Sequence, residues 1–168
     1  MTAQPHPGGT TLRRRRPVAL AALAALAVAA LGALATDLGP WYQGLEQPAW
    51  KPPDVLFGPA WTVIYTLTAL SALLALQKAA PGAARHNLLA FFGVNATLNV
   101  LWSLLFFRFQ RPDWALYEVV PFWASICVLV LATARVSRLA SGLLLPYLAW
   151  VSFAAALNLA VVRLNAPF

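Results

Sequence analysis

Three apolar stretches of the sequence carry aromatic and amide side chains at helical spacing. Because residues three or four apart share one face of a helix, each set forms a stripe along its stretch. Indole and phenol rings stack on flat apolar molecules, and amides donate and accept hydrogen bonds. This combination favours a flat, largely apolar ligand bound between helices. The stripes are Trp61, Tyr65 and Thr68; Asn95, Asn99, Trp102 and Ser103; and Trp150, Ala154, Leu157 and Asn158.

The same residues also have a purely structural interpretation. Asn, Ser and Thr often join membrane helices by hydrogen bonds, and Trp and Tyr often lie at the lipid–water interface. Each residue taken singly fits that interpretation better. The combination fits it less well, because Trp61, Trp102 and Trp150 cannot all anchor one interface if their faces converge. The alanines at 154–156 beside them leave room for a ligand.

The elements that would position these stripes must lie in a membrane. Of the 168 residues, 61% are hydrophobic and only 10% are charged, whereas soluble domains have about 25% charged residues. So few charges cannot cover a water-facing surface. Since a helix needs about 20 apolar residues to cross a bilayer, we expect an all-α integral membrane protein built as a five-transmembrane-helix bundle. The expected spans are Val18–Thr36, Pro59–Ala79, Asn87–Phe107, Trp114–Ala134 and Leu143–Arg163.

The residues outside the predicted spans indicate how the chain is oriented in the membrane and how it divides into domains. We expect a disordered basic tail over residues 1–17 and one membrane domain over residues 18–165. More than half of the net charge of +7 comes from Arg13–Arg16, directly before an apolar run. That placement indicates membrane topology rather than a nucleic-acid partner, and it predicts a cytoplasmic N-terminus. A single cysteine, Cys127, and two distant histidines predict neither a disulfide framework nor a metal site.

A proline-rich stretch, PAWKPPDVLFGPAW, runs from Pro48 to Trp61 between the first two spans. Proline fixes φ and removes a backbone donor, so such a segment loses little entropy when it covers an opening. Trp50, Leu56 and Phe57 supply apolar contacts. We predict a stiff lid over a cavity; a loop that merely rests on lipid headgroups is the alternative.

Glu118 lies one turn into the predicted fourth span, near Arg108 and Arg111. We interpret it as part of an ion pair at the interface, because an unpaired charge inside a membrane is costly. A proton relay is the less favoured alternative.

Three motifs occur in the order typical of one known family. WYQGLEQPAWKPPDVLFGPAWTVIY precedes and enters the second span, LNVLWSLLFF ends the third, and LPYLAWVSFAAALNLAVVRLN forms the fifth. These motifs resemble the translocator protein family, which includes bacterial tryptophan-rich sensory proteins and the mitochondrial peripheral benzodiazepine receptor. The resemblance runs from about Val18 to Asn165. It implies a five-helix bundle, often dimeric, with a pocket open toward the first loop, and a first helix that is retained rather than cleaved.

The resemblance also implies a function. Ligands of the family include porphyrins, haem, sterols in some members, and synthetic isoquinoline carboxamides and benzodiazepines. We expect a membrane receptor or carrier for porphyrin-type tetrapyrroles, porphyrin or haem, which requires no cofactor. The alternatives are a light-dependent porphyrin-degrading enzyme, a passive tetrapyrrole or sterol transporter, and a regulatory partner of another membrane protein. The expected setting is a bacterial cell membrane, with lipid contacts, a homodimer and no nucleic acid.

Site residues follow from the stripes and the resemblance together. Porphyrin degradation in some bacterial members depends on aromatic residues whose matching positions here are Tyr42, Trp61 and Trp150. We expect Asn95, Asn99 or Asn158 to orient polar groups of the ligand and Lys51 to meet a carboxylate. The predicted ligand-binding residues are Trp50, Trp61, Tyr65, Asn95, Asn99, Trp102, Trp114, Trp150, Ala154 and Leu157.

The chain departs from the family pattern at two places. Gln47 stands where lysine usually precedes the first loop proline, and Lys51 follows instead. Leu159 stands where the sterol motif of mammalian members has tyrosine, before Arg163. The second departure argues against sterol binding.

Overall fold

The computed structural model describes residues 23, 26–28 and 30–168. The predicted tail, the arginine run and about half of the predicted first span lie outside these residues. Every regular element in the described part of the chain is helical, which confirms the all-α class. A helical stretch between Leu26 and Ala35 comes first. It is followed by α2 (Pro40–Gln43), η1 (Asp54–Leu56), α3 (Phe57–Lys78), α4 (Ala83–Ser103), η2 (Leu104–Arg108), α5 (Pro112–Ala134), α6 (Arg138–Gly142) and α7 (Leu145–Asn165).

Four helical segments are long and apolar enough to cross a membrane. They coincide with the predicted second to fifth spans, although each begins or ends a few residues away. The helical stretch Leu26–Ala35 is shorter than the roughly 20 residues that a crossing needs. The count of five spans therefore stays a prediction. The four segments are Asp54–Lys78, Ala83–Arg108, Pro112–Ala134 and Arg138–Asn165.

Proline and glycine set several of the helix ends. Pro112 and Pro146 lie in the first turns of α5 and α7, where a missing backbone N–H costs no hydrogen bond. Gly82 precedes α4 with φ +102°, a conformation that a residue with a Cβ rarely adopts. Pro121 lies inside α5, as membrane helices tolerate where neighbouring groups satisfy the freed carbonyl.

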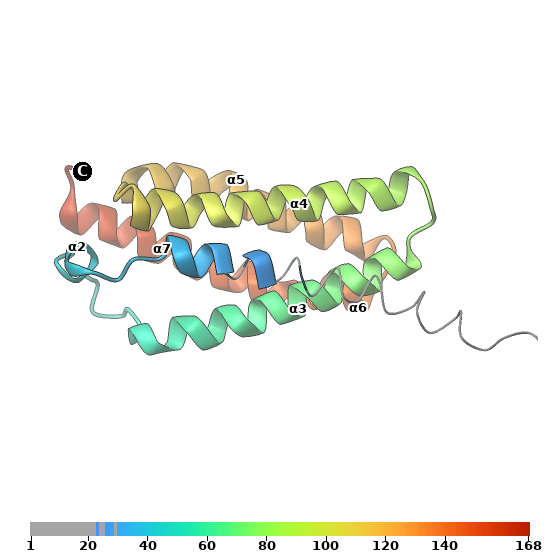
Figure 1. The fold of residues 1–168 in the computed structure, drawn as a ribbon, viewed down its shortest axis with the longest axis horizontal. Coiled ribbons are helices and arrows are strands. Elements are labelled where there is room, and N and C mark those ends of the chain that lie inside the picture. The colour runs from blue at the N-terminus through green and yellow to red at the C-terminus, as the bar shows by residue number, and fades with distance from the viewer. Residues whose placement is uncertain (1–22, 24–25, 29) are drawn as a thin grey trace, which may run out of the picture.

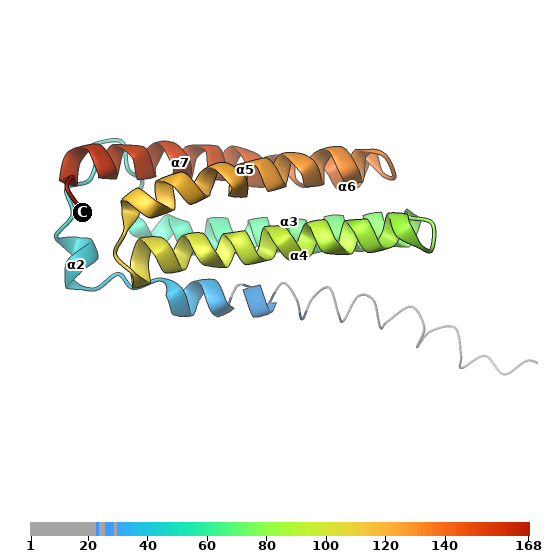
Figure 2. The same ribbon diagram turned by 90° about the horizontal axis from the view of Figure 1, so that it is seen from above.

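The four long helices run along one common axis (Figures 1 and 2). α5 packs against both α4 and α7, and α3 packs more closely against α4 and α6 than against α7. The main core cluster consists of Ile64, Val119, Phe122, Ile126, Leu129, Leu144, Tyr147 and Val151. The backbones of α3 and α7 lie farther apart, and these helices meet through the side chains of this cluster.

One end of the bundle gathers α2, the segment before η1 and the C-terminus, as Figures 1 and 2 show. Phe168 packs there against the cluster that includes Trp41 and Tyr42. The irregular segment runs from Gly44 to Pro53, whereas Pro59 and Trp61 lie within α3. The proline-rich loop is therefore shorter than the stretch from Pro48 to Trp61 that the sequence indicated.

This irregular segment is attached to α7. The Glu46 N–H donates to Asn165 Oδ1 at 2.7 Å, and Asn165 Nδ2 donates to the Glu46 carbonyl at 2.9 Å. The Trp50 ring meets the Phe153 ring edge to face, with centroids 5.8 Å apart. The segment is thus fixed over the end of the bundle rather than free in solution.

The third span ends in a π-helical turn, η2. Such turns are rare and occur often at functional sites, because the wider turn redirects side chains. Phe106 and Phe107 lie in η2 and contact Trp102 of α4. The turn therefore gathers aromatic rings at the end of the bundle that carries α2.

Candidate ligand-binding cavity

A cavity of about 1000 Å³ lies at the α2 end of the bundle. Its walls come from the helical stretch between Leu26 and Ala35, from α3, from α4 with η2, and from α7. Gln47, from the irregular segment, and Asp54, from η1, line it at one side. Gly32 of the first helical stretch lies beside Tyr65 of α3, since a Cβ there would lie 3.4 Å from the Tyr65 hydroxyl. The aromatic lining residues are Tyr42, Phe57, Trp61, Tyr65, Trp102, Phe106, Phe107 and Trp150.

One group of rings comes from α3 and α7. Trp61 stacks on Tyr65 with centroids 5.2 Å apart and planes inclined by 25°. Trp61 also meets Trp150 edge to face at 6.5 Å and 82°. Phe57 contacts Trp150 in the same way at 5.6 Å. Each ring is held by a neighbouring ring, so this wall offers π faces in fixed orientations.

A second group comes from α4 and η2. Trp102 stacks on Phe106 at 5.2 Å and 27°, and Phe107 meets Trp102 edge to face at 6.1 Å. Tyr42 of α2 joins this group through a tilted contact with Phe107 at 5.6 Å. Aromatic surface thus reaches the cavity from α2, α3, α4, η2 and α7.

The hydroxyl groups in the wall are already satisfied. Thr62 Oγ1 donates to the Gly58 carbonyl, and Thr66 Oγ1 donates to the Thr62 carbonyl. Ser103 Oγ donates to the carbonyl of Asn99 at 3.4 Å. Each of these three hydroxyls donates its one proton to a backbone carbonyl, so none of them has a donor left for a ligand. Apart from Gln47, Asp54 and Asn158, the wall is mainly apolar and aromatic.

Several predicted residues line this one cavity although they come from distant parts of the sequence. The α3 pair Trp61 and Tyr65 lies beside Trp150. Of the residues predicted to bind ligand or degrade porphyrin, those in the lining are Tyr42, Trp61, Tyr65, Trp102, Trp150, Ala154 and Leu157.

Asn95 and Asn99 lie behind the wall, buried in the bundle. The Tyr65 hydroxyl donates to Asn99 Oδ1 at 2.9 Å, and Asn99 Nδ2 donates to the Tyr147 hydroxyl at 3.3 Å. Tyr147 in turn donates to Asn95 Oδ1 at 3.2 Å, and Asn95 Nδ2 donates to Ser125 Oγ at 2.8 Å. This network joins α3, α4, α7 and α5. The two amides hold helices together and position Tyr65, and they do not line the cavity.

Asn158 lines the cavity, but its amide already has partners on both sides. Its Oδ1 accepts from Trp102 Nε1 at 3.3 Å, and its Nδ2 donates to the Pro112 carbonyl at 2.9 Å. The amide therefore positions Trp102 and joins α4, α5 and α7. A ligand would have to compete with these bonds to use it.

Trp50 and Trp114 lie outside the cavity. Trp50 is 52% exposed and lines a separate shallow groove together with Pro48 and Arg163. Trp114 is 51% exposed, and the Arg111 guanidinium lies 4.3 Å from the centroid of its ring. Neither side chain lines the space beside Trp61 and Trp150.

The predicted ion pair of Glu118 is wrong. Arg111 pairs with Asp113, two residues along the same chain. Glu118 is only 8% exposed, and neither carboxyl oxygen has a hydrogen-bond partner among the described residues. Its helical position turns it toward the bundle interior beside Ala115 and Phe122, whereas the arginine is at the helix start.

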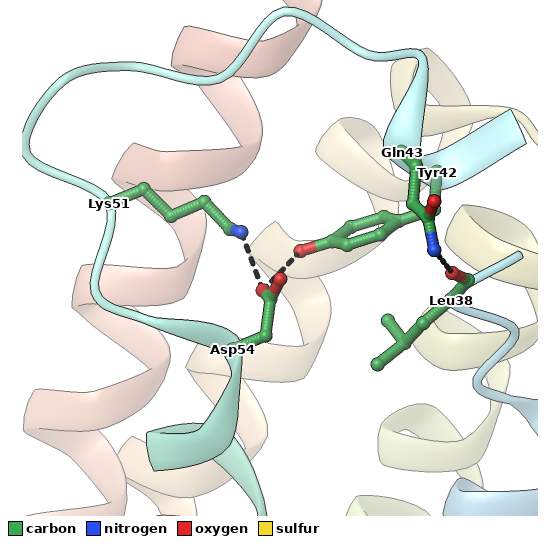
Figure 3. Close-up of polar contacts among 5 residues, drawn as sticks. All are labelled: Leu38, Tyr42, Gln43, Lys51 and Asp54. Atoms are coloured by element: carbon green, nitrogen blue, oxygen red, sulfur yellow. Dashed lines mark hydrogen bonds and ion pairs between the residues drawn. The ribbon is translucent and has the colours of Figure 1, made fainter. Parts of the chain in front are cut away.

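Charged groups occur at the side of the cavity that Gln47 and Asp54 line, which we call the mouth. Figure 3 shows the side chains of Tyr42, Lys51 and Asp54 converging. Lys51 Nζ and the Tyr42 hydroxyl both donate to Asp54 Oδ1, the latter at 3.0 Å. Lys51 Nζ also lies 5.2 Å from the centroid of the Tyr42 ring. These contacts tie α2, the irregular segment and η1 to one another.

The environment of these groups shifts their protonation. Burial raises the pKa of the Tyr42 phenol above its ordinary value, against the opposing effect of Lys51. Burial lowers the pKa of Lys51, but the hydrogen bonds to Asp54 and Tyr42 outweigh it, so the pKa is raised overall. Lys51 is therefore charged and Tyr42 neutral at physiological pH.

Sequence reasoning missed several residues of the site. Tyr147 is completely surrounded by protein and links Asn95 to Asn99; its place after Pro146 gave no sign of that role. Phe106 and Phe107 lie within a quoted motif but were not assigned to the cavity. Gln47 was noted only as a departure from the family, although it lines the cavity.

Comparison with known proteins agrees with the motifs. The model of the TspO/MBR family matches residues 19–164. The chain is 40% identical over 130 residues to the tryptophan-rich protein TspO of Chlorobaculum tepidum, covering 74% of this chain and 79% of the relative. It is 40% identical over 126 residues to TspO of Archaeoglobus fulgidus (75% and 80%). The translocator protein of Homo sapiens is 32% identical over 126 residues (74% and 75%).

The matched region contains the whole cavity and all four apolar spans except Asn165, the last residue of the fourth. Its extent confirms the family that the three motifs predicted. The chain is an integral membrane protein and belongs to the TspO/MBR family.

Proposed function

We propose that the chain binds porphyrin-type tetrapyrroles in the cavity and acts as a receptor or carrier for them. The main observation behind this proposal is a largely apolar cavity of about 1000 Å³, which is lined by Trp61, Trp102 and Trp150 from three helices. Small-molecule sites usually measure about 300–1000 Å³, so this one suits a large ligand. Relatives named tryptophan-rich sensory protein and translocator protein are consistent with a sensing or carrying role.

The binding energy would come mainly from apolar burial. Each Å² of apolar surface removed from water contributes about 25 cal/mol before the costs of association. A good stacking contact adds about 0.5–1.5 kcal/mol beyond area. Because the rings of this cavity are held in place by one another, little ordering entropy would be lost on binding.

A ligand panel tests the proposal directly. Purified protein in detergent micelles is titrated with protoporphyrin IX and, separately, with cholesterol, and quenching of tryptophan fluorescence is followed. Saturable quenching by protoporphyrin, with none by cholesterol, is expected. Equal, unsaturable quenching of the protein and of free tryptophan in the same micelles would contradict the proposal.

Light-dependent porphyrin degradation is the second candidate function. The observation that favours it is that Tyr42, Trp61 and Trp150, the oxidisable residues that match the family's degrading members, all line the same cavity. Illumination of the protein with protoporphyrin in air should then bleach the Soret band, and Trp150→Phe should abolish the bleaching. Equal bleaching in empty micelles would exclude the activity.

We also propose that the chain carries porphyrins passively across the membrane, forms a homodimer and has a cytoplasmic N-terminus. Passive carriage is tested by porphyrin flux into proteoliposomes, and the proposed homodimer by cross-linking in native membranes. Accessibility of single cysteines placed at the two ends of α3 reports whether the N-terminus is cytoplasmic.

A further inference from the structure

Few buried polar atoms in the described part of the chain lack a hydrogen-bond partner there. Native proteins keep few such atoms, because an unpartnered buried polar group is costly, so each one needs a reason. Of the three residues involved, Gln47 is the one that lines the cavity. The atoms are Gln47 Nε2, Thr68 Oγ1 and both carboxyl oxygens of Glu118.

The backbone around Gln47 is fixed, whereas its amide can turn. Asn165 holds the preceding residue, Glu46, through both its N–H and its carbonyl, and Pro48 follows. The last torsion of a glutamine side chain has a broad energy profile. The amide can therefore rotate its N–H toward an acceptor that enters the cavity, without any change in the segment itself.

A positive charge lies four residues after Gln47, in the same irregular segment. Lys51 Nζ reaches Asp54, which lines the cavity mouth together with Tyr42 (Figure 3). An ammonium group has three N–H donors, so one bond to Asp54 leaves others available. Arg163 lies in the neighbouring outer groove, which Gln47 also lines. The carboxylate of Asp54 acts against the positive charges of Lys51 and Arg163, because it would repel an anionic ligand group bound at the same place.

We propose that Gln47 is a specificity-determining residue which, with Lys51, binds the carboxylate substituents of the tetrapyrrole. The macrocycle would lie among the rings of α3, η2 and α7, with its acidic edge at the mouth under the irregular segment. The chain would therefore select tetrapyrroles that carry free carboxylates over esterified ones. This inference rests on the proposed function and names the ligand class more narrowly.

Two ligands with the same macrocycle separate binding of the ring from binding of its carboxylates. Protoporphyrin IX carries two free propionates, and its dimethyl ester carries none. Titrations of the full chain in non-ionic micelles give a dissociation constant for each. Because hydrogen bonds to a charged acceptor are strong, the wild type should bind the diacid about tenfold or more tightly than the ester.

Variants at the mouth assign the preference to residues. Gln47→Leu should bring the two affinities to within about threefold by weakening diacid binding while leaving ester binding unchanged. Gln47→Glu, which keeps the shape but replaces the donor by an acceptor, should weaken diacid binding further. Asp54→Asn should strengthen diacid binding several-fold, because it removes the opposing charge while keeping an acceptor for Lys51 and Tyr42.

Gln43→Leu is the matched control. Gln43 lies in α2 near the same mouth, but its amide donates to the Leu38 carbonyl at 3.1 Å and does not line the cavity (Figure 3). It should leave the diacid preference unchanged. Equal binding of both ligands by the wild type, or an unchanged preference in both Gln47 variants, overturns the inference while the proposed function stands. No binding of either ligand overturns both.

Discussion

The indole rings of Trp61 and Trp150 meet edge to face, with centroids 6.5 Å apart and planes inclined by 82°. The two residues lie in α3 and α7, which also meet through Phe57 with Trp150 and through Trp61 with Tyr147. This contact defines one corner of the cavity. A ligand that lies against either ring is therefore affected by both.

Replacing either indole at this corner should weaken binding of protoporphyrin. Trp61→Phe and Trp150→Phe each keep a ring but lose stacking area, so the dissociation constant should rise about two- to tenfold. The midpoint of the fluorescence titration is the quantity to compare, because each variant also loses one fluorophore. Trp123→Phe is the matched control, since Trp123 donates to Ser152 and does not line the cavity. An equal effect in the control would mean that the indoles act through overall stability.

Trp114→Phe should leave the affinity for protoporphyrin unchanged. The resemblance to the family assigned Trp114 to the pocket, but its ring is half exposed and contacts Arg111. The same titration shows whether Trp114 contributes to binding, as the resemblance implies, or does not, as its position outside the cavity implies. A loss of affinity as large as that of Trp61→Phe would require Trp114 to move into the cavity when ligand binds.

Tyr147→Phe should destabilise the bundle by about 1–3 kcal/mol, because it leaves the Asn99 donor and the Asn95 acceptor buried without a partner. The expected size is above the roughly 0.6 kcal/mol average of hydrogen bonds between membrane helices, since two polar groups lose one shared partner. Unfolding in mixed micelles with increasing SDS measures it. Tyr117→Phe is the control, because Tyr117 is 79% exposed. Equal unfolding curves for the two variants would show that the network adds no stability.

Asn165→Ala should loosen the segment over the cavity. The change removes the acceptor of the Glu46 N–H and the donor to its carbonyl. Hydrogen exchange of the Glu46 amide should become faster, and bound protoporphyrin should dissociate faster in stopped-flow displacement. Asn165→Asp keeps the acceptor for the Glu46 N–H but loses the donor, so it should give an intermediate rate. Unchanged exchange at Glu46 in the alanine variant would mean that other contacts fix the segment.

The apolar spans could be predicted closely from the sequence, because the length of an apolar run decides whether a helix crosses a membrane. The cavity rings of α3 could be predicted for a related reason. Trp61 and Tyr65 are four residues apart, and that spacing places them on one face in any helix. The stacked contact between them follows from the spacing.

Other parts of the site depend on neighbours that the sequence does not reveal. Asn95 and Asn99 share a face as predicted, but which helix covers that face is decided by tertiary packing, and Tyr147 occupies the space where a ligand was expected. Trp50 and Trp114 have the expected residue types, yet their orientation follows from local contacts with Phe153 and Arg111. The π-helical turn η2, in which Phe106 is buried, likewise has no marker in composition.

The bond between Glu46 and Asn165 has a consequence for how the molecule is made. A ribosome delivers residue 46 to the membrane long before residue 165 exists, so the covering segment lacks this anchor while the intervening helices insert. Only the arrival of α7 brings both Trp150 and the anchoring asparagine. A nascent chain stalled within that helix would lack one wall of the cavity, so the cavity is complete only after synthesis has passed this point.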